Sequence, residues 1–186
     1  MTPYILASAS PRRREICALA DIPVEILPAP DGVEPPPDAS LSPQEAVLRV
    51  ARAKAEAVAN DHPDRIVIGA DTTVWLGREP LGKPADEADA AAMLRKLSGN
   101  THQVVTAVWV CSPQKCAGFH DTADVTFYPM SEEDIAAYIA TGEPMDKAGA
   151  YGIQGKGMVY IEALHGDFYT VMGLSGAKLK RFLNEF

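Results

Sequence analysis

Four short segments place polar side chains where packing gives no reason for them. Ser8–Arg14 carries hydroxyl and guanidinium groups, Gly69–Thr72 a carboxylate, Gly82–Pro84 a lysine, and Asp146–Gly155 a charged pair and an amide. A carboxylate can take a proton from water, while guanidinium and ammonium groups neutralise charge on a phosphorus centre. Together these groups are the parts of a phosphate-ester or anhydride hydrolase.

The first segment brings three consecutive arginines, Arg12–Arg14, to the start of an expected helix. Ser10 is its expected N-cap and Pro11 its first residue. Unpaired N–H groups and the positive end of the helix dipole meet there, so the guanidinium groups repel one another unless an anion sits among them. On spacing alone, a phosphate site and a solvated basic turn are equally supported.

A second helix is expected to begin at Ser42, which forms a capping box with Glu45, and to run to about Asn60. Lys54 lies on the apolar stripe of this helix. A lysine at such a position either extends past the edge of the core or points into a cleft, and the spacing alone favours the first.

A near-continuous apolar run at residues 65–70 is typical of a buried strand, and its end delivers the carboxylate of Asp71. An isolated aspartate at a strand end is more often a turn or cap residue. The assignment of Asp71 as a catalytic base therefore depends on the other three segments.

Alternating strands and helices predict an α/β fold. Further strands are expected at 4–7, 24–27, 102–110 and 117–127, further helices after Asp86 and Ser131 and at the carboxyl end, and a closing hairpin from 158–164 and 168–172. Residues 28–37 are rich in proline and are expected to form a loop that contains Glu34.

The chain has 186 residues and a net charge of -8, which fits one domain or two closely packed lobes and argues against a nucleic-acid polymer or an anionic membrane as partner. It lacks an apolar run of about 20 residues and a signal-peptide pattern, so a cytoplasmic protein is expected. Cys111 and Cys116 flank a turn and either face each other across a hairpin or, as the spacing favours, are reduced packing residues.

The ordered segments resemble the Maf family of nucleoside triphosphate pyrophosphatases over nearly the whole chain. The likeness rests on Ile5-Leu6-Ala7-Ser8-x-Ser10-Pro11-Arg12-Arg13, the Lys54 helix, Gly69-Ala70-Asp71-Thr72, Gly82-Lys83-Pro84, Leu97-Ser98-Gly99, Thr101-His102-Gln103-Val104, Asp146 to Gly155 and Val171-Met172-Gly173-Leu174. The resemblance implies hydrolysis between the α- and β-phosphates of a nucleoside triphosphate, with a divalent cation such as Mg²⁺ or Mn²⁺.

The resemblance also implies roles for individual residues. It makes Asp71 the proton acceptor and Lys83 and Lys54 the catalytic cations. The resemblance also implies that Ser8 and Arg13 bind phosphate together with the two lysines. Glu34 and Asp71 are expected to bind the metal ion. The family often has two adjacent acids at the loop position where this chain has Glu34 alone. The expected protein ligands of the metal ion are therefore few.

Substrate choice in the family follows three positions, which are Arg12, Thr72 and Gln154 in this chain. This set resembles the branch that acts on dTTP and UTP, since the sister branch, which prefers 7-methyl-GTP, has an aromatic residue at the position of Arg12. An amide such as Gln154 can pair with a pyrimidine edge.

For the architecture, the resemblance implies a Maf/ITPase-like, elongated α/β fold with a mixed, bent sheet and a deep cleft between two lobes. Family members often form homodimers, so a homodimer is expected on the resemblance alone. Two alternatives stay open: a nucleotide-binding regulator of septum formation that does not require turnover, and a 7-methyl-GTP pyrophosphatase.

Overall fold

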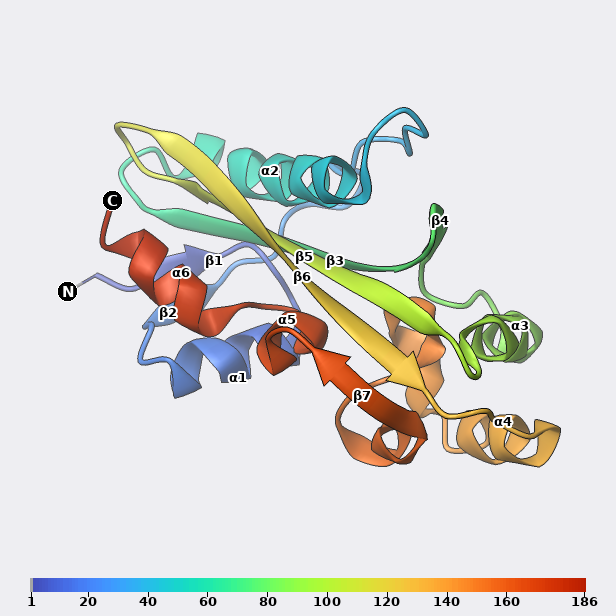
Figure 1. Cartoon of the computed structure of the whole chain (residues 1–186). Coiled ribbons are helices and arrows are strands. Elements are labelled where there is room, and N and C mark those ends of the chain that lie inside the picture. The colour runs from blue at the N-terminus through green and yellow to red at the C-terminus, as the bar shows by residue number, and fades with distance from the viewer. Residues whose placement is uncertain (1) are drawn as a thin grey trace. The chain divides into compact units, whose positions relative to one another are not determined.

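The computed structural model describes residues 2–186 as a mixture of strands and helices (Figure 1). The strands are β1 (Tyr4–Leu6), β2 (Val24–Ile26), β3 (Val67–Leu76), β4 (Glu79–Leu81), β5 (Thr101–Cys111), β6 (Cys116–Phe127) and β7 (Ile161–His165). The α-helices are α1 (Pro11–Leu19), α2 (Pro43–Asp61), α3 (Glu87–Leu97), α4 (Glu132–Ile139), α5 (Phe168–Met172) and α6 (Gly176–Leu183). Short 3-10 helices are η1 (Glu143–Asp146), η2 (Ala148–Ala150) and η3 (Gly155–Tyr160). The predicted α/β class is confirmed.

The seven strands form one mixed sheet in the order β2-β1-β3-β5-β6-β7, with β4 paired to β3. β1 runs parallel to β2 and β3, whereas β4 is antiparallel to β3 and β7 is antiparallel to β6. The predicted mixed sheet is confirmed. Within residues 2–186, the structure contains no helix of the length and apolar character needed to cross a membrane.

The chain divides into two compact units. Unit 1 contains the chain up to Thr72, Thr106–Asp121 and Gly173–Phe186, and unit 2 contains Thr73–Val105 and Thr122–Met172. β3, β5 and β6 each contribute residues to both units.

The core of unit 1 forms where α2 packs on β1 and β3. Val58 of α2 lies with Ile5 of β1, with Ala7 directly after β1 and with Val67 of β3, all of them buried. Figure 1 shows α2 on one side of β1 and α1 with α6 on the other. This arrangement fixes α2 against β3, the strand that carries Asp71.

The core of unit 2 gathers apolar residues from α3, α4 and the strands. Its buried members include Leu94, Leu97, Val104, Phe127, Ile135, Tyr138 and Tyr151. Burial of this surface holds the segments that follow α4 against the sheet strands of the same unit.

The helix starts follow local capping chemistry. Ser42 accepts a hydrogen bond from the Glu45 N–H and forms the predicted capping box, and Ser131 does the same with Asp134. Ser10 is the N-cap residue of α1, as predicted, but its side chain makes no capping hydrogen bond. Its own N–H donates to Ser8 Oγ at 3.3 Å instead.

The expected closing hairpin of residues 158–164 and 168–172 is wrong. Residues 155–160 form η3, and β7 pairs with β6, so that Val125 lies opposite Leu164. The segment Phe168–Met172 is the short helix α5. A long-range partner for β7 therefore replaces the local hairpin that the two apolar runs indicated.

Asp71 lies within a strand and not at its end, contrary to the prediction. β3 is continuous from Val67 to Leu76 and turns at Gly77, whose φ is +60°, into the unpredicted strand β4. The β-branched residues Thr72 and Thr73 favour continued strand structure past the carboxylate.

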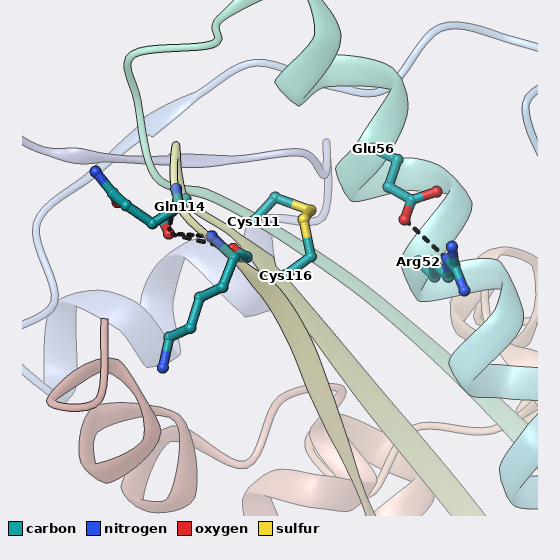
Figure 2. The surroundings of a disulfide bond; sticks show 7 residues. Arg52, Glu56, Cys111, Gln114 and Cys116 are labelled. Carbon is teal, nitrogen blue, oxygen red and sulfur yellow. Dashed lines mark hydrogen bonds and ion pairs between the residues drawn. A yellow bond between two sulfur atoms is a disulfide. The ribbon is translucent and has the colours of Figure 1, made fainter.

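Cys111 and Cys116 form a disulfide at the turn between β5 and β6 (Figure 2), so the preferred expectation of reduced cysteines at these positions is wrong. Their separation of 5 residues brings the two Cα atoms to opposite positions across the hairpin at 4.2 Å. Cys17 is a free, buried cysteine, and burial raises the pKa of its thiol to about 11.

Candidate functional site

The centre of the candidate site in unit 1 is an ammonium group between two carboxylates. Lys54 Nζ lies 2.8 Å from Asp71 Oδ1 and 2.7 Å from Glu34 Oε1. The Lys54 and Asp71 side chains are only 16% and 18% exposed, whereas that of Glu34 is 60% exposed. Lys54 therefore does not simply extend past the edge of the core into solvent, because its ammonium group lies against these two carboxylates.

Close packing of α2 on β3 makes this contact. A Cβ atom added to Gly69 would lie 2.3 Å from the Ala51 carbonyl oxygen and 2.6 Å from the Ala55 backbone nitrogen. Only glycine permits this approach, which places Lys54, one residue before Ala55, beside the carboxylate of Asp71 two positions along the same strand face.

Arg13 is the second centre of unit 1 and joins distant parts of the chain. Its Nε donates to the Gly173 carbonyl at 2.9 Å, its Nη1 to Ser8 Oγ at 3.0 Å, and its Nη2 to Thr72 Oγ1 at 3.2 Å. Burial lowers the pKa of Arg13, and the nearby Asp71 carboxylate opposes that effect. The guanidinium nonetheless stays charged at neutral pH.

Thr72 occupies an internal position in this network. Its Oγ1 lies 2.8 Å from Thr106 Oγ1 and 3.3 Å from the Gly173 carbonyl oxygen, in addition to the bond from Arg13. Thr106 and the Gly173 carbonyl were not predicted as site groups, because Thr106 lies inside β5 and Gly173 stood out only as part of the family resemblance. Thr72 thus holds Arg13, which is a different task from direct contact with a base.

The two arginines beside Arg13 differ from each other in exposure. Arg12 is half-buried and Arg14 is exposed. The Arg13 guanidinium makes three hydrogen bonds within unit 1. The structure thus distinguishes the exposed Arg14 from the partly buried Arg12 and Arg13, and the roles expected of Arg12 and Arg13 stay predictions.

Unit 2 contains Lys83 and Gln154, both of them exposed. The Gly149 N–H donates to the Gly82 carbonyl at 3.0 Å, which joins the Lys83 loop to the Asp146–Gly155 segment. The four segments with unexplained polar residues therefore form two pairs. Ser8–Arg14 meets Gly69–Thr72 in unit 1, and the other two meet in unit 2.

The donor set around Asp71 fits a small hard cation in part. Asp71 and Glu34 direct carboxylate oxygens to one point, which is occupied by the Lys54 ammonium group. Over residues 2–186, no three His, Cys, Asp or Glu side chains gather in a way that could hold a metal ion. Two carboxylates are sufficient for Mg²⁺ when substrate phosphates supply further oxygen ligands.

A surface pocket of about 450 Å³ also lies in unit 1, lined by Ser42, Gln44, Glu45, Leu48 and His120. None of the predicted site residues lines it. It belongs to the first turns of α2 and not to the surroundings of Lys54.

Sequence comparison relates the whole chain to one family. The model of the family described as "Maf-like protein" matches residues 3–186. A protein from Bacillus velezensis is 52% identical over 98% of this chain and 95% of its own, one from Aquifex aeolicus 50% over 97% and 94%, and one from Bacillus mycoides 47% over 100% and 96%. Each of these relatives is named dTTP/UTP pyrophosphatase.

A solved structure of a HAM1 protein from Coxiella burnetii aligns over the full length of both chains, with a TM-score of 0.48 and 14% sequence identity. That likeness is too low to support a conclusion. The match of the family model to residues 3–186, together with relatives about half identical over nearly their full length, decides the matter: the chain belongs to the Maf family.

Proposed function

We propose that the chain is a nucleoside triphosphate pyrophosphatase that converts dTTP and UTP to the monophosphate and pyrophosphate. The observation that carries the proposal is the shared name of relatives that cover nearly the whole chain. The carboxylate of Asp71, held by Lys54, and the anchored guanidinium of Arg13 supply groups suited to this reaction. A cytoplasmic location is part of the proposal, because nucleoside triphosphates are available there.

In the proposed reaction, Asp71 orients a water molecule and accepts its proton. The water oxygen bonds to the α-phosphorus, the bond from that phosphorus to the α,β-bridging oxygen breaks, and pyrophosphate leaves with the electron pair. Lys54 donates to Asp71 Oδ1, which fixes the carboxylate and leaves its second oxygen to take the proton.

We propose Glu34 and Asp71 as the residues that would hold a divalent cation, Mg²⁺ or Mn²⁺. When bound, such an ion neutralises charge on the phosphate oxygens. Because the same two carboxylates pair with Lys54, the ammonium group and a cation would share one set of oxygen atoms.

The phosphate-binding role of Ser8, Arg13 and Lys83 stays a proposal. Three of the five N–H donors of Arg13 bind within unit 1, which leaves two for a phosphate oxygen. For the base, we propose that Arg12 and Gln154 contact it and that Thr72 acts through Arg13. The exposed amide of Gln154 is suited to a pyrimidine edge.

Pyrophosphate release from dTTP, UTP, 7-methyl-GTP and ATP with Mg²⁺ tests the proposal. We expect the highest kcat/KM for dTTP and UTP. A preference for 7-methyl-GTP would instead place the chain in the sister branch. Tight nucleotide binding with no pyrophosphate release from any of the four would contradict the enzymatic proposal and favour a regulator that only binds nucleotides.

A further inference from the structure

The segment that contains Gln154 donates backbone hydrogen bonds to the carboxylate of Glu143. We call Gly152–Gly157 the Gln154 loop. The Lys156 N–H donates to Glu143 Oε2 at 2.9 Å, and the Gly157 N–H donates to Glu143 Oε1 at 3.1 Å. Glu143 therefore fixes the backbone on the carboxyl side of Gln154.

Tyr138 connects the same carboxylate to the other side of the loop. Its side chain is 1% exposed, and its hydroxyl donates to Glu143 Oε1 at 2.8 Å. The same hydroxyl accepts a hydrogen bond from the Gly152 N–H at 3.0 Å. The Tyr138–Glu143 pair thus grips the loop two residues before Gln154 and again two and three residues after it.

The glycines of the loop permit this grip. A Cβ atom on Gly157 would lie 2.3 Å from the Gly152 carbonyl oxygen and 2.6 Å from the Tyr138 hydroxyl oxygen. One on Gly155, whose φ is +75°, would lie 2.6 Å from Glu143 Oε2. The backbone can reach the carboxylate only because these positions lack side chains.

Glu143 carries its charge in this position. Burial raises its pKa, but the hydrogen bonds from the Lys156 N–H, the Tyr138 hydroxyl and the Gly157 N–H together lower the pKa by more than burial raises it. The net change is downward. Charge-assisted hydrogen bonds are the stronger kind, which makes the carboxylate a firm anchor for two backbone N–H groups. Gln154, by contrast, is exposed, and its amide is available to a ligand.

We propose that Glu143, together with Tyr138, is a positioning residue for base selection, because the pair fixes the backbone on both sides of Gln154. This inference rests on the proposed function. All of the residues involved belong to unit 2, so the argument needs no placement relative to unit 1. Glu143 acts through the loop and does not itself contact substrate.

The test compares Glu143→Gln with Glu133→Gln, which removes the same charge from an exposed position of α4. An amide at position 143 turns an NH₂ group towards N–H donors and so loses at least one hydrogen bond. We expect the ratio of kcat/KM for dTTP to that for ATP to fall about tenfold in Glu143→Gln, mainly through KM for dTTP. The Glu133→Gln variant should keep the ratio of the unaltered protein.

Coupling to Gln154 separates positioning from a general loss of structure. Gln154→Ala should lower the same ratio, and adding Glu143→Gln to it should change the ratio less than twofold. Tyr138→Phe loses only a hydroxyl and should lower the ratio as well. It provides the test should Glu143→Gln not fold. An unchanged ratio in folded Glu143→Gln and Tyr138→Phe, or in Gln154→Ala, would overturn the inference. Absence of dTTP hydrolysis in the unaltered protein would instead overturn the proposed function.

Discussion

Arg13 shows how one side chain can combine support and recognition. Its guanidinium binds Ser8, Thr72 and the Gly173 carbonyl, so it joins three stretches of unit 1 before any substrate arrives. A planar group with five donors is suited to this task, whereas a lysine offers a single point of charge. Arg13 is therefore a structural residue as well as a candidate phosphate ligand.

Arg13→Lys should lower the free energy of unfolding by about 2 kcal/mol, because the fork that bonds to three partners is lost. Urea unfolding followed by circular dichroism measures this change. Arg14→Lys is the matched control, since Arg14 is exposed in the same helix, and it should change stability by less than about 0.5 kcal/mol. Equal changes of the unfolding free energy in the two variants would contradict a stabilising role for the three hydrogen bonds of Arg13.

Residue types and their order predict part of the candidate site. The segments with Ser8, Arg13 and Asp71 stand out because polar groups interrupt apolar patterns, and the structure brings all three into unit 1. The positioning role of Glu143 could not be predicted from the sequence, because the main-chain N–H groups that it binds lie more than ten residues later. The only sequence signal is the glycine spacing of 152, 155 and 157, which indicates a close backbone approach to something bulky.

At the scale of elements, the contact between α2 and β3 brings Lys54 to Asp71. Helices α2 and α4 could be predicted because their capping boxes are local, and the structure confirms both. A strand was expected where β7 lies, but its pairing with β6 could not be predicted, because a local pattern does not encode the partner of a strand, and the apolar run at α5 indicates a strand rather than a helix. The position of Asp71 within β3 was missed for a related reason, since the pairing of β3 with β4 extends the strand.

Gly69→Ala should destabilise the protein by more than about 3 kcal/mol, because the added methyl group would meet the α2 backbone at 2.3 Å. The same change at Gly82, where a Cβ atom has nothing within 4 Å, is the control and should be nearly neutral for stability. Thermal unfolding of both variants measures the difference. A Gly69→Ala protein as stable as the control would show that α2 does not approach β3 so closely.

His102 of β5 gives a pH-dependent prediction for unit 2. It is 1% exposed, its Nε2 lies 2.7 Å from the Tyr151 hydroxyl oxygen, and burial lowers its pKa from 6.5 to about 4. As the pH falls below 6.5, the unfolded chain takes up the proton first, so stability falls until about pH 4 by roughly 3 kcal/mol. Above pH 6.5, His102 is neutral in both the folded and the unfolded chain, and the full stability is retained.

Urea unfolding of the protein and of His102→Gln at a series of pH values between 7 and 4 checks this prediction. Glutamine cannot titrate in this range, so the difference in unfolding free energy between the two proteins should change with pH, and the loss of stability should be smaller in the variant. Parallel pH profiles would show that His102 is not the group responsible.

For the whole molecule, each unit contributes one pair of the chemically unusual segments. Unit 1 holds Asp71, Lys54 and Arg13, and unit 2 holds Lys83 and the Gln154 loop. The proposed phosphate ligands, Arg13 and Lys83, come from both units, and so do the proposed base contacts, Arg12 and Gln154. The expected homodimer and the cleft between lobes stay predictions from the family resemblance.

Hydrolysis of dTTP in ¹⁸O-labelled water shows whether water attacks the α-phosphorus and whether Asp71 is the base. Mass spectrometry of the products from the protein and from Asp71→Asn, with Mg²⁺ present, locates the label. We expect labelled dTMP and unlabelled pyrophosphate, formed about a hundredfold or more slowly by the variant. Label in pyrophosphate or orthophosphate, or an Asp71→Asn rate equal to that of the unaltered protein, would contradict this expectation.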